Sequence, residues 1–192
     1  MNTSHLSRRM AAAVAAVALP VSLGILAPQA FAANMDGPFG PACAAVPTEG
    51  AGSFDGMAAA PVATAASNNP ELSTLVAAVQ KAGLVDTLNN AENITVFAPT
   101  NAAFEKIPKA DLDKVLADKA PLTKILTYHV VGEKVDKAAL ADGSFKTLQG
   151  GMVTTDGSGD AYEVNESAKI VCGGVPTSNA TVHIIDTVLM PK

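Results

Sequence analysis

The fold is decided by the stretch Ile94-Thr95-Val96-Phe97-Ala98-Pro99-Thr100-Asn101-Ala102-Ala103-Phe104. Its first five residues are apolar on both alternating faces apart from Thr95, which predicts a short strand covered on both sides. Pro99 has no N–H for a strand ladder and stops the strand. Thr100 can then cap a helix by accepting a hydrogen bond from the N–H of Ala102 or Ala103. Pro99 and Phe104 have the spacing of a hydrophobic staple, which fixes the angle between strand and helix. The stretch contains no group for acid–base or nucleophilic chemistry.

A helix is predicted before this strand from its cap and its apolar stripe. Asn69 caps a helix that begins at Pro70 and ends at Gly83. Its apolar side chains recur at the spacing of a face that packs on a core, at Leu72, Leu75, Val76 and Val79. The Ala-rich segment 57–67 predicts a further short helix, and residues 84–88 predict one more helical turn.

The pattern after the strand changes from helical to extended. Residues 112–116 predict a short amphipathic helix, and a second helix opens at Pro121 and ends near Tyr128, before extended residues 129–131. From Ser144 onward alternation and Gly-rich turns predict strands at 145–148, 152–155, 162–165, 169–172 and 181–190. Helices gather in the first half and strands in the second, which is typical of the α+β class.

Asp186 interrupts the apolar face of the last predicted strand. In a regular strand it would share a face with Val182, Ile184 and Val188, where an unpartnered carboxylate is costly. Either Asp186 is a hydrogen-bonded structural carboxylate, or a bulge near Ile184-Ile185 turns it outward. We favour the bulge or an edge position.

The N-terminus has the features of a secretory signal. Arg8 and Arg9 precede the apolar run 10–26, and Ala30-Phe31-Ala32 is a small-x-small cleavage signal. We predict cleavage after Ala32 by the general secretory route; a retained membrane anchor and the twin-arginine route are the alternatives. Without the signal no membrane span is expected.

The mature chain is acidic and lacks arginine. Both arginines of the sequence lie in the signal, which leaves 11 lysines against 18 acidic residues and a net charge of −7 for residues 33–192. Recognition of nucleic acid relies on guanidinium contacts, so a nucleic-acid partner is not expected. The acidic excess also disfavours an anionic membrane surface.

Two cysteines remain, Cys43 and Cys172. In an exported protein such a pair most often forms one disulfide, although two free thiols or an intermolecular bridge are alternatives. Residues 33–56 are rich in Gly and Pro, which predicts an irregular arm. A bridge would pin this arm to a strand near the C-terminus.

The candidate catalytic and metal-binding groups all have simpler structural interpretations. His129 and His183 have no Cys or carboxylate at ligand spacing, so we interpret them as hydrogen-bonded structural imidazoles. No Gly-x-Ser-x-Gly elbow and no phosphate loop occur. Residues 156–160 resemble the start of a calcium loop, but Ala161 and Ser167 stand where glycine and glutamate are needed, which favours a hairpin turn.

Three blocks of the sequence resemble the fasciclin-type domain. They are residues 95–104, the pair Tyr128-His129 and residues 180–191, in the order found in that family. Further segments resemble the secreted mycobacterial fasciclin-type antigens: residues 66–72, 126–131 and 171–175, and the Gly-Pro-x-Cys arm that ends at Cys43. The resemblance marks as structural signature residues Thr95, Phe97, Pro99, Thr100, Phe104, His183 and Asp186.

The resemblance implies a single domain with a wedge-shaped β-sandwich or sheet and helices packed along one side. Together with the leader and the arm identified from their residues, it divides the chain into a signal peptide at 1–32, an arm at 33–56 and a fasciclin-type domain at 57–192. The resemblance also implies a disulfide between Cys43 and Cys172. The expected interaction surface comprises Tyr128, His129, Gly174 and Val175. Gly174-Val175 stands where adhesive animal domains have an Asp-Ile pair, so binding to animal integrins is in doubt.

Three functional hypotheses follow. The first is a secreted, non-enzymatic, monomeric module without cofactor, which mediates adhesion or protein–protein interaction at the bacterial envelope or with host matrix. The alternative is a carrier of a small lipid or glycan ligand, because an apolar helix layer on a small sheet can leave a groove. An enzyme is the least favoured hypothesis, since no nucleophile–base pair is apparent.

Overall fold

The central strand of the fold is β1 (Ile94–Pro99), and the computed structural model that contains it describes residues 37–191. β1 pairs in parallel with β7 (Ala180–Ile185) along its whole length and antiparallel with β2 (Val130–Val131). Every residue of β1 is buried, so the predicted strand covered on both faces is confirmed. The predicted leader, its cleavage site and the first residues of the arm lie outside the described residues.

The predicted corner after β1 is also confirmed. The Thr100 side chain accepts a hydrogen bond from the N–H of Ala103 at 3.2 Å, at the start of α5 (Asn101–Glu105). Pro99 and Phe104 are both buried and line one small cavity, as expected for a hydrophobic staple.

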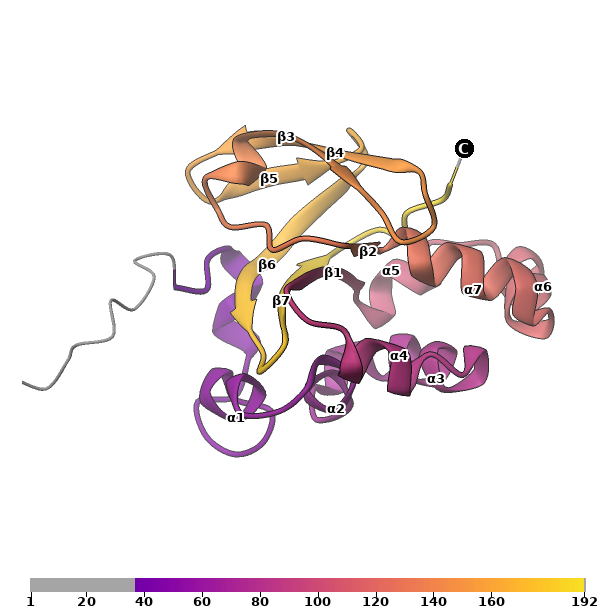
Figure 1. Cartoon of the computed structure of the whole chain (residues 1–192), viewed down its shortest axis with the longest axis horizontal. Helices are drawn as coiled ribbons and strands as arrows, with labels where there is room; N and C mark the ends of the chain where they lie inside the picture. The colour runs from indigo at the N-terminus through magenta and orange to yellow at the C-terminus, as the bar shows by residue number, and fades with distance from the viewer. Residues whose placement is uncertain (1–36, 192) are drawn as a thin grey trace, which may run out of the picture. The chain divides into compact units, whose positions relative to one another are not determined.

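Within residues 37–191, seven strands form one sheet in the order β2-β1-β7-β6-β5-β4-β3, and only the β1–β7 pair is parallel. The remaining strands are β3 (Asp142–Lys146), β4 (Met152–Ser158), β5 (Ala161–Val164) and β6 (Ala168–Pro176). Figure 1 shows β3, β4 and β5 on the far side of β1 and β7 from helices α2, α3 and α4. The α+β prediction is therefore confirmed, and residues 156–160 do form a hairpin, with Ser158 paired to Ala161.

The two edges of this sheet are hydrogen-bonded to each other. Val131 forms an isolated bridge with Thr147, just beyond β3, and the N–H of Leu148 donates to the Val130 carbonyl at 2.8 Å. The sheet thus closes on itself, which removes the free edges of β2 and β3.

The last strand is shorter than predicted. β7 ends at Ile185, and the expected strand over 186–190 is wrong. The irregularity opposite Ile184-Ile185 lies in β6, where Val171 is the extra residue between Ile170 and Cys172. Asp186 lies just past the strand end and is partly exposed, so no carboxylate is placed on the apolar face.

The helices follow the predicted order with some shifted boundaries. η2 (Pro70–Leu72) leads into α3 (Ser73–Ala82), whose cap Gly83 has the left-handed φ of +73° that favours glycine. The others are α4 (Val85–Asn90), α6 (Lys109–Ala117) and α7 (Lys119–Tyr128). α7 begins before Pro121 because Asp118 provides the cap, accepting from the Ala120 N–H at 3.0 Å.

The segment predicted as one Ala-rich helix over 57–67 is divided. It forms α1 (Phe54–Ala58) and α2 (Val62–Ser67), and Pro61 stands between them as the residue that precedes α2. Because α1 begins at Phe54 and η1 spans Pro41–Ala45, the prediction of an irregular arm at 33–56 is wrong for these positions. A further short turn, η3, spans Ala139–Ala141.

The buried residues form two apolar clusters, one on each face of the central strands. On the helix side, Val182 and Ile184 of β7 pack with α2, α3, α4 and α7. On the other side, Phe97 and Ile185 pack with residues of β4, β5 and β6. The alternation of β1 and β7 thus supplies both clusters. None of the helices within residues 37–191 has the length and hydropathy to cross a membrane.

Candidate functional site

His129 is a buried side chain that links α7 to the C-terminal segment through hydrogen bonds. Its Nδ1 lies 2.9 Å from the Ile125 carbonyl and its Nε2 accepts from the Leu189 N–H at 2.9 Å, so Nδ1 carries the proton of a neutral ring. Burial lowers the pKa of His129 from 6.5 to about 4, although the hydrogen bond to Ile125 raises it slightly. With both nitrogens occupied by backbone, the imidazole has none left for a substrate or a metal.

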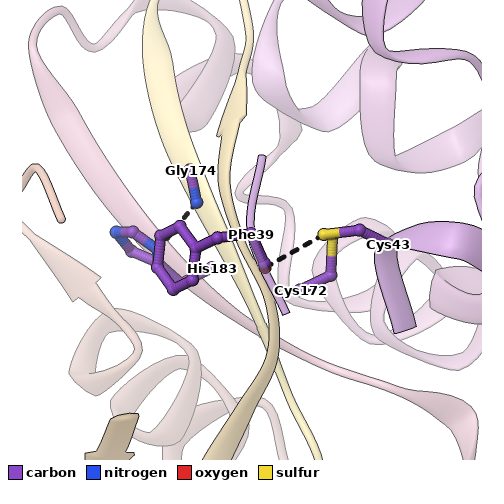
Figure 2. The surroundings of a disulfide bond; sticks show 5 residues. All are labelled: Phe39, Cys43, Cys172, Gly174 and His183. Carbon is purple, nitrogen blue, oxygen red and sulfur yellow. Dashed lines mark hydrogen bonds between the residues drawn. A yellow bond between two sulfur atoms is a disulfide. The ribbon is translucent and has the colours of Figure 1, made fainter. Parts of the chain in front are cut away.

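His183 of β7 is also a buried imidazole that bonds to backbone through both nitrogens, but its proton is on Nε2. Its Nδ1 accepts from the Gly174 N–H at 3.1 Å and its Nε2 donates to the Val135 carbonyl at 3.2 Å. The ring stacks on Phe97 with centroids 5.5 Å apart. Burial lowers the pKa of His183 to about 4, against the raising effect of its hydrogen bond to Val135. Gly174 has φ +68°, which orients its N–H toward the ring as Figure 2 shows.

Tyr128 supports an exposed turn. Its hydroxyl donates to the Met152 carbonyl at 2.8 Å and accepts from the Asn165 Nδ2 at 3.1 Å. The backbone between Thr147 and Met152, which we name the 147–152 turn, is further held by Gln149, whose N–H donates to the Thr127 carbonyl. Tyr128 itself is only 6% exposed, so its buried side chain supports the turn from the interior of the domain.

The four residues predicted as an interaction surface offer little of their side chains to a partner. Tyr128, His129 and Val175 are buried and Gly174 is partly buried. Nor are the two pairs neighbours in the sheet, because β1 and β7 lie between β2, which follows His129, and β6, which holds Gly174 and Val175. What is exposed near Tyr128 is the 147–152 turn, where Leu148 is 47% and Met152 51% exposed.

The arm is attached by the predicted disulfide and by a buried ring. Cys43 of η1 and Cys172 of β6 are bonded, with Cα atoms 4.9 Å apart. Phe39 pairs with Gly173 through both backbone hydrogen bonds, 3.0 and 2.7 Å long. Its ring packs edge-on against Tyr162 at 5.3 Å and occupies the space where a side chain at Gly173 would stand. Figure 2 shows this ring beside His183 and the bridge.

The signature residues hold backbone in place. The Thr95 hydroxyl donates to the Glu133 carbonyl at 2.8 Å and accepts from the Val135 N–H at 2.7 Å. Asp186 accepts from the Lys169 N–H at 2.9 Å and from the Lys106 Nζ at 3.0 Å. Partial burial raises the pKa of Asp186, but the hydrogen bonds from Lys169, Lys106 and Thr187 outweigh it and hold the pKa below 3.8. Four other signature residues are buried: Phe97, Pro99, Phe104 and His183.

Two asparagines that the sequence did not single out have comparable roles. Asn101 accepts from the Thr74 N–H at 2.9 Å and donates to the Pro70 carbonyl at 2.9 Å, so it caps α3 from another helix. Asn179 accepts from the Val62 N–H at 2.9 Å and donates to carbonyls at the end of α4. Polar residues in turn positions were the available signal, but their partners are distant in sequence.

An apolar cavity of about 190 Å³ lies between the helices and the sheet. Its walls come from α2, α3, α4, β1 and β7, with Leu126 of α7 and Leu148 of the 147–152 turn. This is the space between helix layer and sheet where the sequence predicted a groove. Across the described part of the chain, no three His, Cys, Asp or Glu side chains gather closely enough to hold a metal ion.

The fold and these contacts define a class of protein, and sequence comparison agrees with it. Residues 70–191 match the Fasciclin domain, and the chain belongs to that family. It is 47% identical to the immunogenic protein MPB70 of Mycobacterium bovis, over 99% of this chain and 97% of that protein. It is 54% identical to the cell surface glycolipoprotein MPB83 of the same organism, over 74% of this chain and 66% of that protein. The predicted extracellular location is confirmed by these relatives.

More distant matches extend the family likeness. The chain is 40% identical to protein sll1483 of Synechocystis over 66% of its length and 71% of that protein. A solved FAS1 domain pair from the insect cell adhesion molecule fasciclin I superposes with a TM-score of 0.58 at 18% identity. That match covers 71% of this chain and 52% of the insect chain, so this chain spans about half of it. At this identity the likeness concerns the fold.

Proposed function

We propose that the mature chain is an extracellular, non-enzymatic binding module that contacts a protein of the cell envelope or of host matrix. Its membership of the fasciclin family and its likeness to a cell surface glycolipoprotein support this function. The supporting observation in the structure is the 147–152 turn. Three large apolar side chains stand out as exposed among the described residues: Leu148, Met152 and Met190. Two of the three belong to this turn.

The turn has the properties of a preformed contact site. Leu148 and Met152 project from a backbone that is hydrogen-bonded to Tyr128, Thr127 and Val130, so little ordering entropy is lost when a partner binds. Apolar side chains held by a rigid support are the usual energetic centre of a protein–protein contact. Within the Tyr128-His129 pair, Tyr128 therefore acts through the turn that it supports, whereas His129 holds the C-terminal segment.

Catalysis is not part of the proposal. Both described histidines are buried, neutral and fully hydrogen-bonded to backbone, and both described cysteines are in the disulfide. A nucleophile in residues 37–191 would thus lack an imidazole base.

The test is affinity capture with immobilised residues 33–192, exposed to envelope extracts and to purified host matrix proteins. We expect a saturable binder whose affinity falls at least tenfold for the double variant Leu148→Ser, Met152→Ser. The control is Glu163→Ser, Lys169→Ser, an exposed cross-strand pair away from the turn, which should bind as the unchanged chain does. No saturable binder in either set would contradict the proposal.

A second candidate function is the carriage of a small ligand, which the cavity between helices and sheet favours. Its apolar walls suit a lipid better than a glycan, whose hydroxyl groups would be left without partners. Native mass spectrometry of freshly purified protein should show a species heavier than the polypeptide. The bare polypeptide mass alone would weaken this candidate.

A further inference from the structure

The cavity between helices and sheet is lined almost entirely by hydrocarbon. Its deep walls include Leu72, Leu75, Val79, Leu88 and Val96, all buried. A cavity of comparable size with such walls stays dry and takes up small apolar molecules. Water has few polar partners there, so the space is better filled by an apolar group.

The lining carries no charge. None of the residues that border the cavity is Asp, Glu, Lys or Arg, and the one titratable ring, His129, is neutral with both nitrogens bonded. The exposed members of the lining are mostly polar and uncharged and form a rim: Thr64, Ser67, Asn68, Gln80 and Thr87, with Leu148. The interior therefore fits an uncharged apolar group, and the rim fits a neutral polar end.

We infer that this cavity binds the hydrocarbon chain of a free, uncharged single-chain amphiphile, whose polar end lies among the rim residues. The inference rests on the second candidate function and names its ligand class and site. A bilayer is the less suitable source, because the acidic mature chain would be repelled by an anionic surface. A two-chain lipid is less suitable, because its second chain would lie outside this volume.

The volume sets a chain length. At about 30 Å³ for each water-sized group, 190 Å³ holds roughly six of them. Each buried methylene should tighten binding about fourfold. Affinity should therefore rise steeply with chain length up to about six carbons and level off for longer chains, whose ends remain in water.

The experiment is an NMR titration of residues 33–192 with the straight-chain 1-alkanols from butanol to decanol. We expect fast-exchange shifts of amide signals in α2, α3 and α4, and dissociation constants that fall about fourfold for each added carbon before reaching a plateau. Equal affinity for all chain lengths, or shifts confined to residues outside the cavity, would overturn the inference.

Two neighbouring positions of α3 provide the variant and its control. Val76 lines the cavity and is partly buried, whereas Ala77 is exposed and does not border it. Val76→Phe should fill the cavity and weaken octanol binding at least tenfold, while Ala77→Phe should leave it unchanged. Val76→Ala should move the plateau to a longer chain, a gain of function that no folding defect can mimic. Equal octanol affinity in all three variants would refute the site.

The outcomes separate the site from the function. If octanol binding does not change in Val76→Phe, this cavity is not the binding site, although the carrier function would remain possible at another site. Binding at the cavity with only bare polypeptide in native mass spectra supports the site and counts against carriage in the producing cell. Sedimentation with vesicles of neutral phosphatidylcholine, without any response to free alkanols, would show a membrane contact and overturn the inference.

Discussion

Single buried polar side chains join segments of this domain that are distant in sequence. His129 connects α7 to Leu189, and His183 connects Gly174 to Val135. Each of these rings must be neutral to accept from a backbone N–H, so each ties the fold to the deprotonated form of histidine. These two histidines therefore stabilise the folded domain, and they do so only in their neutral form.

Acidification should weaken the fold through these two rings. Their pKa is about 4 in the folded state and 6.5 when unfolded, so the unfolded chain takes up more protons between these values. Stability is then fully present above pH 6.5 and is lost as pH falls toward 4, by up to about 3 kcal/mol for each ring. Urea unfolding at a series of pH values measures this slope. Asp186, with its pKa below 3.8, adds a further loss only at lower pH.

The control for this prediction is His183→Asn, whose Oδ1 can replace Nδ1 as the acceptor for Gly174. It should lower stability at pH 7, yet reduce the slope between pH 6.5 and 4 by about half. An unchanged slope would mean that other groups cause the acid sensitivity.

Asn101→Ala should destabilise the domain by about 1 kcal/mol, within the range for a lost helix cap. The substitution removes the acceptor for Thr74 and the donor to Pro70 at the start of α3. Thermal unfolding measures the effect. Asn90→Ala is the matched control, because Asn90 is exposed and bonds only within its own helix region, to Asp86; a loss as large as that of Asn101→Ala would contradict the capping role.

Residues 39–45, which we name the clasp, are attached to β6 and do not form a loose arm. η1 is joined to β6 by the disulfide between Cys43 and Cys172. Phe39 pairs with the backbone of Gly173, and its ring packs against that glycine. On the loop-entropy model a bridge between residues 129 positions apart contributes about 4–5 kcal/mol. The ring adds the burial of a phenyl group against Tyr162.

Phe39→Ala should cost about 3–5 kcal/mol with the disulfide intact, because it leaves a phenyl-sized void in the cluster. Urea unfolding under non-reducing conditions measures this cost. Phe54→Ala is the comparison, since Phe54 is only partly buried and should cost less. Equal losses would show that the Phe39 ring has no special place in the core.

Elements whose signals are local could be predicted from the sequence. The strand at 94–98, the Thr100 cap and the Gly83 helix end each depend on residues within one turn of one another. The end of β7 was missed because it depends on Asp186 and its partners Lys106 and Lys169, which no local pattern reveals. α1 was missed because Gly and Pro dominate the composition of its surroundings. The interpretation of His129 as a hydrogen-bonded structural imidazole is confirmed. The burial of Tyr128 was missed, because the Tyr-His motif was also assigned to an interaction surface through the family's association with adhesion.

At the scale of the whole molecule, two strands that are distant in sequence pair at its centre. β1 and β7 are the parallel pair against which both apolar clusters pack, although residues 100–179 lie between them in the sequence. The helix layer, the sheet and the clasp all contact this pair or its neighbour β6. Neither cluster is complete without it.

A chain of residues 33–179 should fail to fold because it lacks β7, including His183. Circular dichroism and urea titration should show no cooperative transition, whereas residues 33–189, which keep Leu189 and its bond to His129, should unfold cooperatively. A cooperative transition in the shorter chain would show that β1 does not need its parallel partner.

The parallel pairing of β1 with β7 also determines when the protein can fold. As synthesis proceeds from the N-terminus, β1 has no central partner until Ala180–Ile185, which follows it by residues 100–179, has emerged. Pairings between residues so far apart in sequence form slowly. For a chain that we propose is exported behind a cleavable leader, we expect this late pairing to keep the polypeptide unfolded during export and to delay folding until it is outside the cell.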